Sequence, residues 1–427
     1  MTETFTFIEL FCGVGGFRVG LEALGGRCVW ACEIDRKAAE TYTANFGQTP
    51  YHDVRTARPG KGLPRRFDLL TAGFPCQDFS GLGAQQGLRG KKGALFYEVV
   101  RLLRETRPPM FLGENVRGLL TLEGGAVMRT VVAEIEQLGY HVRFGEINSL
   151  CVVPQYRARV YIVAFLDETK AEAFGDIPAS PIRLNPARTL ASCLQSLREE
   201  PFLNHYRLSA RNWHAVKQSK TTRKYGVESR LVRPESLETD TLIRSYRTSK
   251  LSLSQFVLDV CEQTPGVVRR PRWLTPREAA RLMGFPESFL LPPGLTAYEQ
   301  LGNAVTPAVI ALVAGKMFGD EMRGLRACVK LTLAAMEKEK GRMFAQSGRV
   351  VSPVWSGPVR ELVAEEGGGS GGGGGGGSDR NGDDGMFRWA TVATGAATVA
   401  ACVVFAAIYG ADRQSRESGM SSRTGRK

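Results

Sequence analysis

The 427-residue chain is too long for one ordinary domain and suits two or three. Hydrophobic residues at 43% and aromatic residues at 9% exclude a wholly disordered protein. The formal net charge of +13 predicts a polyanionic partner. The nine cysteines form no CxxC or Cys/His cluster, so we expect no metal site, no disulfide framework and a reducing compartment.

Strands and helices are predicted to alternate over the first part of the chain. Residues 5–11 form an apolar run typical of a buried strand, and this early start leaves no room for a targeting peptide. Strands separated by long helices are typical of a mostly parallel α/β sheet. Further strands are predicted at 27–32, 67–72, 109–112, 141–147 and 160–165, and helices at 36–46, 95–105 and 125–138.

The segment from residue 180 to 272 is basic, and its periodicity is weak. It contains 17 Lys and Arg against eight Asp and Glu, which is most of the charge excess of the chain. This pattern indicates either a solvated basic surface or a groove that neutralises phosphates. Helical patterns return at residues 275–283 and 307–317.

The composition changes again after about residue 331. Residues 330–343 predict a charged amphipathic helix, and the Gly-rich residues 367–378 predict a flexible linker. Residues 389–411 carry no charge and are long enough to span a bilayer, yet they are rich in Ala and Thr and contain no Leu. They therefore predict either a membrane anchor or an Ala-rich, disordered or weakly helical tail.

A glycine-rich turn and two acidic residues indicate a nucleoside site at one edge of the predicted sheet. Gly13, Gly15 and Gly16 follow the first strand and open a helix, whose N-terminus is electropositive. Glu33 ends the second strand, where an acid suits a ribose diol, and Asp53 follows later, where it could accept from an adenine amino group. Each acid could instead be a surface carboxylate or a helix cap. Because the pattern is not GxGxxG, a cofactor without phosphates fits better.

Reactive residue types lie beside three other strands. Cys76, between Pro and Gln on a strand-end loop, is placed to be a nucleophile, although a lone Cys is more often a small buried hydrophobe. Glu114 follows an apolar strand and could be a proton donor with a raised pKa. Arg157 and Arg159 lie two positions apart and face the same side of an extended chain. The alternative for these charged residues is a structural ion pair.

Six motifs, in order, resemble those of DNA (cytosine-5)-methyltransferases. They are FCGVGGF at 11–17, GFPCQDFS at 73–80, ENV at 114–116, QYRAR at 155–159, LTPREAARLMGFP at 274–286 and QLGNAV at 300–305. Their order and approximate spacing resemble the family's across residues 5–317. The resemblance implies an α/β fold, namely a doubly wound S-adenosylmethionine-dependent methyltransferase sheet with a small inserted target-recognition domain.

The resemblance also implies transfer of a methyl group from S-adenosylmethionine to C5 of cytosine in DNA. Cys76 would attack C6 as a thiolate, Glu114 would bind N3 and the exocyclic amine, and Arg159 would hold the base. The cytosine would be flipped out of the duplex, and the base that removes the C5 proton is not identified. The catalytic group implied is Cys76, Glu114, Arg157 and Arg159. The cofactor-binding positions implied are Phe11, Gly13, Gly15, Gly16, Glu33, Asp53, Pro75, Leu95, Asn303 and Val305. The substrate-binding positions implied are Gln77, Ser80, Asn115, Thr241, Leu242 and Gln300.

The resemblance divides the chain into parts. Thr241 and Leu242 resemble the Thr-Leu element of the recognition domain. The family usually follows the nearby Tyr246 with glycines, whereas this chain has Arg247. The parts expected are a catalytic and cofactor-binding domain (1–179), a target-recognition domain (180–271), a returning catalytic segment (272–330), a charged helical extension (331–366), a linker (367–386), the membrane or Ala-rich segment (387–411) and a basic tail (412–427).

We expect a monomer that acts on double-stranded DNA, in the nucleus of a eukaryote or in the cytoplasm and nucleoid of a bacterium, with membrane anchoring if residues 389–411 insert. Two alternatives stay open. One is a tRNA cytosine-5 methyltransferase of the same fold, a branch that usually has Pro-Pro-Cys-Gln where this chain has Phe-Pro-Cys-Gln. The other is a catalytically silent DNA-binding relative.

Overall fold

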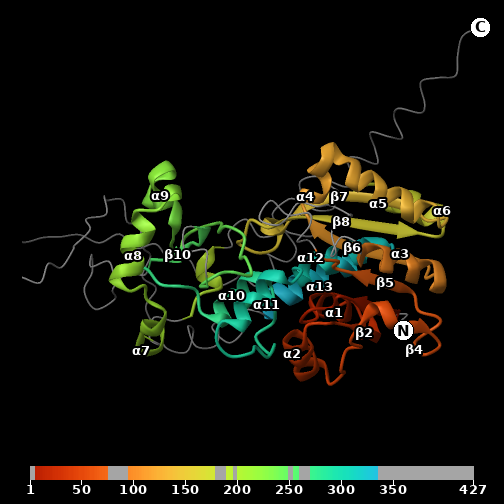
Figure 1. Ribbon diagram of the computed structural model, residues 1–427, viewed down its shortest axis with the longest axis horizontal. Coiled ribbons are helices and arrows are strands. Elements are labelled where there is room, and N and C mark those ends of the chain that lie inside the picture. Colours follow the sequence, from red (N-terminus) through yellow and green to blue (C-terminus); the bar gives the residue numbers. More distant parts are fainter. Residues whose placement is uncertain are drawn as a thin grey trace, which may run out of the picture. The chain divides into compact units, whose positions relative to one another are not determined.

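A computed structural model describes residues 5–75, 95–177, 189–195, 200–248, 253–258 and 270–334. The chain forms two units, Met1–Pro358 and Val359–Lys427, and every described element belongs to the first (Figure 1). None of the described helices has the length and apolar character needed to cross a membrane. Outside the described residues lie Cys76, Gln77, Ser80, the Gly-rich linker and residues 389–411.

Six strands form the main sheet of the first unit, in the order β2-β1-β5-β6-β8-β7. The strands are β1 (Thr6–Leu10), β2 (Arg27–Cys32), β5 (Leu69–Ala72), β6 (Met110–Val116), β7 (His141–Asn148) and β8 (Ala158–Phe165). The first four in this order are parallel, and β8 runs antiparallel to both β6 and β7. The sheet is therefore mostly parallel, which confirms the prediction from the alternating pattern.

Helices cover both faces of this sheet (Figure 1). Side chains alternate between the faces along each strand, so Phe7 and Leu69 enter one core while Ile8 and Leu70 enter the other. The first core is covered by α1 (Gly16–Glu22), α2 (Arg36–Phe46), α6 (Glu168–Phe174), α12 (Pro307–Met317) and α13 (Glu321–Ala334). The second core is covered by α3 (Leu95–Thr106), α4 (Gly118–Thr121) and α5 (Ala126–Glu136).

Two strands are longer than the sequence predicted. β6 continues to Val116 because β8 pairs with it residue by residue, with Glu114 opposite Tyr161 and Val116 opposite Arg159. Glu114 therefore lies inside a strand, where we expected it after one. Arg159 likewise lies inside β8, which begins at Ala158.

The final described helix also differs from its prediction. α13 begins at Glu321, whereas the sequence predicted a charged helix from residue 330. It packs closely on α12, because a Cβ added at Gly315 would lie 2.3 Å from Cα of Gly324. Residues 321–334 therefore belong to the same packed unit as the sheet, and the expected boundary at residue 330 falls inside a helix.

Residues 200–258 contribute short helices and two short strands. Phe256 and Trp273 pack edge to face at 4.8 Å in a third core, which also includes Leu282. This core takes residues from α8 (Ala210–Lys217), β9 (Leu231–Val232), β10 (Phe256–Val257), α10 (Pro276–Met283) and α11 (Thr296–Asn303). Two further short helices of the region are α7 (Glu200–Leu203) and α9 (Lys220–Tyr225). A separate short pair is formed by β3 (Arg58–Pro59) and β4 (Gly62–Leu63).

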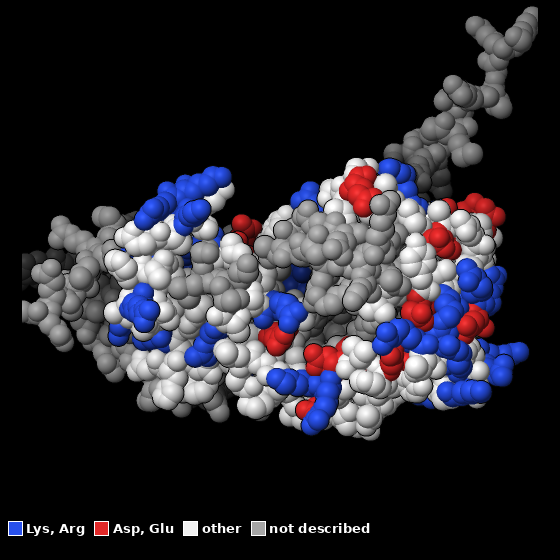
Figure 2. Space-filling model, in the orientation of Figure 1, with Lys and Arg blue, Asp and Glu red and all other residues white. Residues whose placement is uncertain are grey.

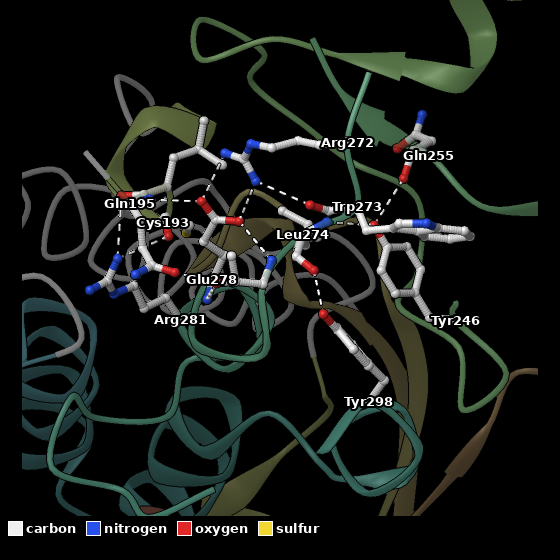
Figure 3. A network of polar contacts seen from close by, with 12 residues as sticks. Cys193, Gln195, Tyr246, Gln255, Arg272, Trp273, Leu274, Glu278, Arg281 and Tyr298 are labelled. Atoms are coloured by element: carbon white, nitrogen blue, oxygen red, sulfur yellow. Dashed lines mark hydrogen bonds and ion pairs between the residues drawn. The ribbon is translucent and has the colours of Figure 1, made fainter. Parts of the chain in front are cut away.

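A buried polar network joins this region to α10 (Figure 3). Arg272 and Glu278 are both fully buried, and Nη1 of Arg272 lies 2.7 Å from Oε2 of Glu278. The Glu278 carboxylate also accepts from the N–H of Thr275, and the Thr275 side chain accepts from the N–H of Glu278, which closes a capping box. The hydroxyl of Tyr246 accepts from the N–H of Leu274 at 2.9 Å. The network therefore fixes where the chain returns from the recognition region.

Candidate active site

The loop after β5 and the end of β6 lie side by side at the carboxyl edge of the sheet, because these strands are parallel neighbours. Asn115, which is 1% exposed, donates from Nδ2 to the carbonyl oxygen of Phe74 at 3.1 Å. This bond fixes the chain two positions before Cys76, which itself lies outside the described residues. It holds the start of the predicted nucleophile loop against the strand that carries Glu114.

Glu114 and Arg159 form a buried pair across neighbouring strands. Nε of Arg159 lies 3.3 Å from Oε1 of Glu114, and the two side chains are only 15% and 11% exposed. Burial raises the pKa of the Glu114 carboxyl above its ordinary value, while Arg159 and Arg157 oppose that rise. A raised pKa favours the protonated carboxyl, which can donate to a ring nitrogen.

Arg157 holds backbone from two distant segments. Its guanidinium donates to the carbonyl oxygens of Leu242 at 3.1 Å, Gly302 at 3.1 Å and Ala304 at 2.7 Å. Leu242 belongs to the recognition region, whereas Gly302 and Ala304 lie at the end of α11. These contacts favour a positioning role for Arg157 over the catalytic role that we expected from the sequence.

Gln155 and Tyr156 hold the Thr-Leu element in place. Oε1 of Gln155 accepts from the N–H of Leu242 at 2.8 Å, and its amide donates to a carbonyl of α10 at 3.1 Å. Thr241 donates from Oγ1 to the carbonyl oxygen of Tyr156 at 2.6 Å. The two expected substrate residues therefore lie beside the start of β8. Sequence reasoning missed Gln155, although its place in the QYRAR motif was the available signal.

The turn between β1 and α1 is closely packed and has unusual backbone angles. Phe11 and Gly15 both have positive φ, 53° and 89°. A Cβ added at Gly16 would lie 2.7 Å from Cγ2 of Val305, so a larger residue there would displace the loop that carries Val305. Asn303, two positions earlier, is exposed. The glycine turn and the residues after α11 therefore meet, as the predicted cofactor site requires.

Glu33 lies just after β2 and contacts the glycine turn. Its Oε2 accepts from the N–H of Gly13, and its Oε1 accepts from the N–H of Asp35, both at 2.8 Å. Burial raises the pKa of Glu33. The next residue, Ile34, is 55% exposed although it is large and apolar, so a flat apolar group could cover it. Sequence reasoning missed Ile34, and the signal was an apolar residue between two acids at a strand end.

Asp53 has a different environment from Glu33. It caps the short 3-10 helix η1 (Val54–Thr56), and Oδ2 lies 2.7 Å from Nη2 of Arg55. The hydrogen bonds from Arg55 lower the pKa of Asp53, which keeps it ionised. The helix-cap alternative therefore describes Asp53 in this structure, and an adenine contact would also involve its neighbour Arg55.

The other expected residues lie around these two groups. Gln300, on α11, donates from its amide to the carbonyl oxygen of Lys37 at 3.0 Å, so its side chain joins α11 to α2. Pro75 and Leu95 are half-buried and flank residues 76–94, which are outside the described part. Within the described residues, no group of His, Cys, Asp and Glu could hold a metal ion.

Comparison with known proteins decides the family, because residues 5–319 match the family model for C-5 cytosine-specific DNA methylase. The chain belongs to this family. The methylase is 37% identical over 316 residues to the type II methyltransferase M.DsaV of Dactylococcopsis salina, which covers 73% of this chain and 85% of that relative. It is 35% identical over 339 residues to M.HpaII of Haemophilus parainfluenzae, which covers 76% of this chain and 92% of that relative. The solved S. pombe Dnmt2 methyltransferase has the same fold, with a TM-score of 0.55 at 20% identity over 74% of this chain and 98% of that one.

The methylase transfers a methyl group from S-adenosylmethionine to C5 of cytosine in DNA. This confirms the expected activity, cofactor and fold, and it favours DNA over the tRNA alternative. The turn fits such a cofactor. A Cβ added at Gly13 would meet nothing within 4 Å, which leaves open space beside the Glu33 carboxylate.

Proposed function

We propose that the methylase acts on double-stranded DNA with Cys76 as nucleophile, Glu114 as proton donor and Arg159 as the residue that orients Glu114. The observation that carries this assignment is the buried Glu114–Arg159 pair beside the loop that leads to Cys76. Base flipping supplies the access that this arrangement needs, because C6 of a stacked cytosine cannot be reached inside a duplex.

The proposed chemistry begins at the sulfur of Cys76. The thiolate adds to C6 of the flipped cytosine and forms a C–S bond. The π electrons of the C5–C6 double bond shift toward C4 and N3. Burial raises the pKa of Glu114 and so favours its protonated form, which would donate to N3 and stabilise the charge that addition creates. C5 would then take up the methyl group that the bound cofactor supplies, with the thioether of the cofactor as the leaving group. A base, which can be solvent, then takes the C5 proton, N3 returns its proton to Glu114, and the C–S bond breaks to release the Cys76 thiolate.

The cofactor would lie between the glycine turn and the residues after β2. Glu33 would accept from the ribose hydroxyls, because both its oxygens are already aimed by backbone N–H groups. Ile34 would cover one face of the adenine, and Asp53 lies within reach of the same loop. Gly13 would let the cofactor approach the backbone, whereas Gly15 and Gly16 would shape the same side of the site by letting Phe46 and Val305 pack against the turn. Phe11, Pro75, Leu95, Asn303 and Val305 complete the proposed cofactor site.

A Cys76→Ala variant tests the nucleophile. We expect it to lose methylation while binding of S-adenosylmethionine and duplex DNA, measured by calorimetry, stays the same. The unaltered protein should form a denaturation-resistant adduct with a duplex containing 5-fluorocytosine, because fluorine at C5 cannot leave as a proton. Turnover by the Ala variant would exclude the covalent mechanism.

A Glu114→Gln variant tests the proton donor, with Glu146→Gln as its matched control. Glu146 lies on β7 of the same sheet and pairs with Arg117 at 2.9 Å, so it is a second carboxyl that contacts an arginine. We expect Glu114→Gln to lower kcat by about 100-fold or more, since an amide cannot transfer a proton. The control should stay within about two-fold of the unaltered rate. Equal rates for the two variants would remove Glu114 from the mechanism.

The methylase is further proposed to act as a monomer in the compartment that holds its DNA, with the bacterial relatives supporting cytoplasm and nucleoid. Equilibrium sedimentation of the full chain, with and without a short duplex, tests the first point. We expect one chain per duplex. A mass of two chains in either sample would contradict a monomer.

A further inference from the structure

Arg247 adopts a backbone conformation that ordinarily requires glycine. The N–H of Thr248 donates to the carbonyl oxygen of Ser245 at 3.1 Å, which closes a turn with Arg247 as its third residue. The φ angle of Arg247 is 66°. Turns with a positive φ at this position strongly prefer Gly, because the Cβ of any other residue type crowds the adjacent backbone carbonyl. The chain therefore forms a turn that suits glycine but places an arginine in it.

Several contacts hold this turn in one conformation. Tyr246, the residue before Arg247, is 4% exposed, and its hydroxyl both accepts from the N–H of Leu274 and donates to the carbonyl oxygen of Gln255 at 3.1 Å. Figure 3 shows Tyr246 pointing into this network. The turn is thus anchored to the third core. These contacts hold Arg247 in a strained backbone conformation that it would not adopt by itself.

The Arg247 side chain rests on an aromatic ring. Its Cζ lies 4.6 Å from the centroid of the Tyr206 ring, and one Nη donates weakly to the carbonyl oxygen of His205 at 3.4 Å. Nearby arginines are neutralised differently, since Arg244 pairs with Glu299 and Arg233 pairs with Glu228. Among the described residues no carboxylate forms an ion pair with Arg247. Stacking therefore fixes the plane of a guanidinium whose charge is not matched by an acid.

We propose that Arg247 is a DNA-contacting residue that helps to determine the target, in addition to the residues that carry out the reaction. This inference rests on the proposed function, because it takes the region around Thr241 and Leu242 to face DNA. A planar guanidinium donates two parallel hydrogen bonds to a pair of acceptors in one plane. In DNA such a pair is offered by O6 and N7 of guanine or by two oxygens of one phosphate.

The test compares Arg247→Gly, Arg247→Lys and a control, Arg233→Gln, in the full chain. Each protein methylates a library of random duplexes, and sequencing of the methylated cytosines gives the preferred context. We expect Arg247→Gly to unfold at the same temperature as the unaltered protein or a higher one, because Gly suits the turn. Its kcat/KM on the preferred duplex should fall about 10- to 100-fold. Arg247→Lys should lose several-fold, since Lys keeps the charge but not the planar fork.

The remaining measurements identify the acceptor. If Arg247 binds guanine, the Gly variant relaxes the library preference at one G·C pair. If Arg247 binds a phosphate, the preference is kept and the slope of log K against log salt decreases by about one. Arg233→Gln should change neither quantity.

Two outcomes would overturn the inference. One is an Arg247→Gly variant whose kcat/KM, context preference and salt slope all match those of the unaltered protein. The other is a variant that unfolds at a lower temperature and loses S-adenosylmethionine binding, which would make Arg247 a structural residue. If the unaltered protein methylates no duplex in the library, the proposed function fails instead, and that result does not depend on Arg247.

Discussion

Glu9 is a buried carboxyl that lies below the cofactor turn, on β1. It is 0% exposed, and its Oε2 accepts from the hydroxyl of Tyr42 at 3.3 Å. Its Oε1 has no hydrogen-bond partner among the described residues. Burial raises the pKa of Glu9 to about 8, although Arg18 opposes the rise. Glu9 is therefore mostly protonated at neutral pH and ionises only above it.

This raised pKa predicts that stability falls as the pH rises. The contribution of Glu9 is fully present below the unfolded value of 4.5 and is lost as the pH passes through about 8. Residue 9 of a Glu9→Gln variant cannot ionise, so the variant should not lose this stability as the pH rises. Between about pH 5 and pH 8.5 we expect the unaltered protein to lose roughly 3 to 5 kcal/mol relative to this variant, measured by urea unfolding. Glu40→Gln, at an exposed ion pair, is the control, and parallel curves for the unaltered protein and Glu9→Gln would refute the argument.

Sequence reasoning pointed to residues at strand ends more readily than to those that act through backbone contacts. Glu33 was singled out because an acid at the end of the second strand suits a ribose diol, and Glu114 because an acid after an apolar strand could be a proton donor. Both roles stay predictions. Gln155 was missed as a positioning residue, because its partners lie about 90 to 130 positions away and no local pattern indicates them. Arg157 was predicted as a site residue, but its three carbonyl partners could not be read from the sequence.

The start of α10 depends on one buried carboxylate. Glu278 accepts four hydrogen bonds, two from Arg272, one from the N–H of Thr275 and one from the N–H of Gln195. A Glu278→Gln variant would set an amide donor against these donors and remove the carboxylate that balances the buried Arg272 charge. We expect it to lower the free energy of unfolding by about 3 to 5 kcal/mol.

The matched control for this prediction is Glu299→Gln. Glu299 also pairs with an arginine, but its side chain is 45% exposed, so we expect a loss of about 1 kcal/mol or less. Urea unfolding of both variants measures the difference. Similar losses for the two would mean that the network around α10 does not determine the stability of this unit.

Basic side chains gather on α8 and α9, as Figure 2 shows. Lys220, Arg223 and Lys224 are exposed, whereas Lys217 is half-buried and lies over the Trp213 ring. If the three exposed residues neutralise phosphates, replacing them with Gln should reduce the slope of log K against log salt by about 2 to 3.

The control for this charge change is a triple Gln variant of Lys61, Arg65 and Arg66, which are exposed around β4. It removes the same charge from a different surface, so its slope should match that of the unaltered protein. DNA binding measured over a range of salt concentrations compares the two. If both variants change the slope equally, only net charge matters, and the basic recognition region is a plain solvated surface.

Helix bounds were predicted more closely than strand ends. The helix at residues 36–46 and the helix at residues 307–317 have the predicted bounds. The first lies between an Asp35 N-cap and a Gly47 C-cap, and the second begins at a proline and is strongly apolar. β6 was predicted too short, because Gly113 and the polar residues after it read as a turn. Only pairing with β8 extends that strand, and the sequence does not show which strand will be its neighbour.

Because the chain divides into two units, we predict that methylation does not need the C-terminal tail. The first unit ends at Pro358, and the six motifs end before that point. We expect a protein truncated after Glu366 to bind S-adenosylmethionine and to methylate naked DNA within about two-fold of the full chain. Loss of cofactor binding on truncation would show that the tail packs on the catalytic unit.

The same pair of proteins tests the membrane anchor that the sequence left open. If residues 389–411 insert, the full chain resists carbonate extraction from membranes and the truncated protein does not. If both are extracted, the tail is a tether and the anchor is wrong. The sequence also placed the end of the catalytic unit too early, because α13 has a charged surface and its close contact with α12 depends on two distant glycines.

The contact between Gly16 and Val305 joins positions about 290 apart in the chain. A ribosome adds roughly 5 to 20 residues per second, so α12 emerges roughly 15 to 60 seconds after α1. During that interval the apolar face that α12 will cover stays open, and the cofactor has no closed site to stabilise the nascent chain. We therefore expect the newly made chain to be prone to aggregation for about as long as its own translation lasts.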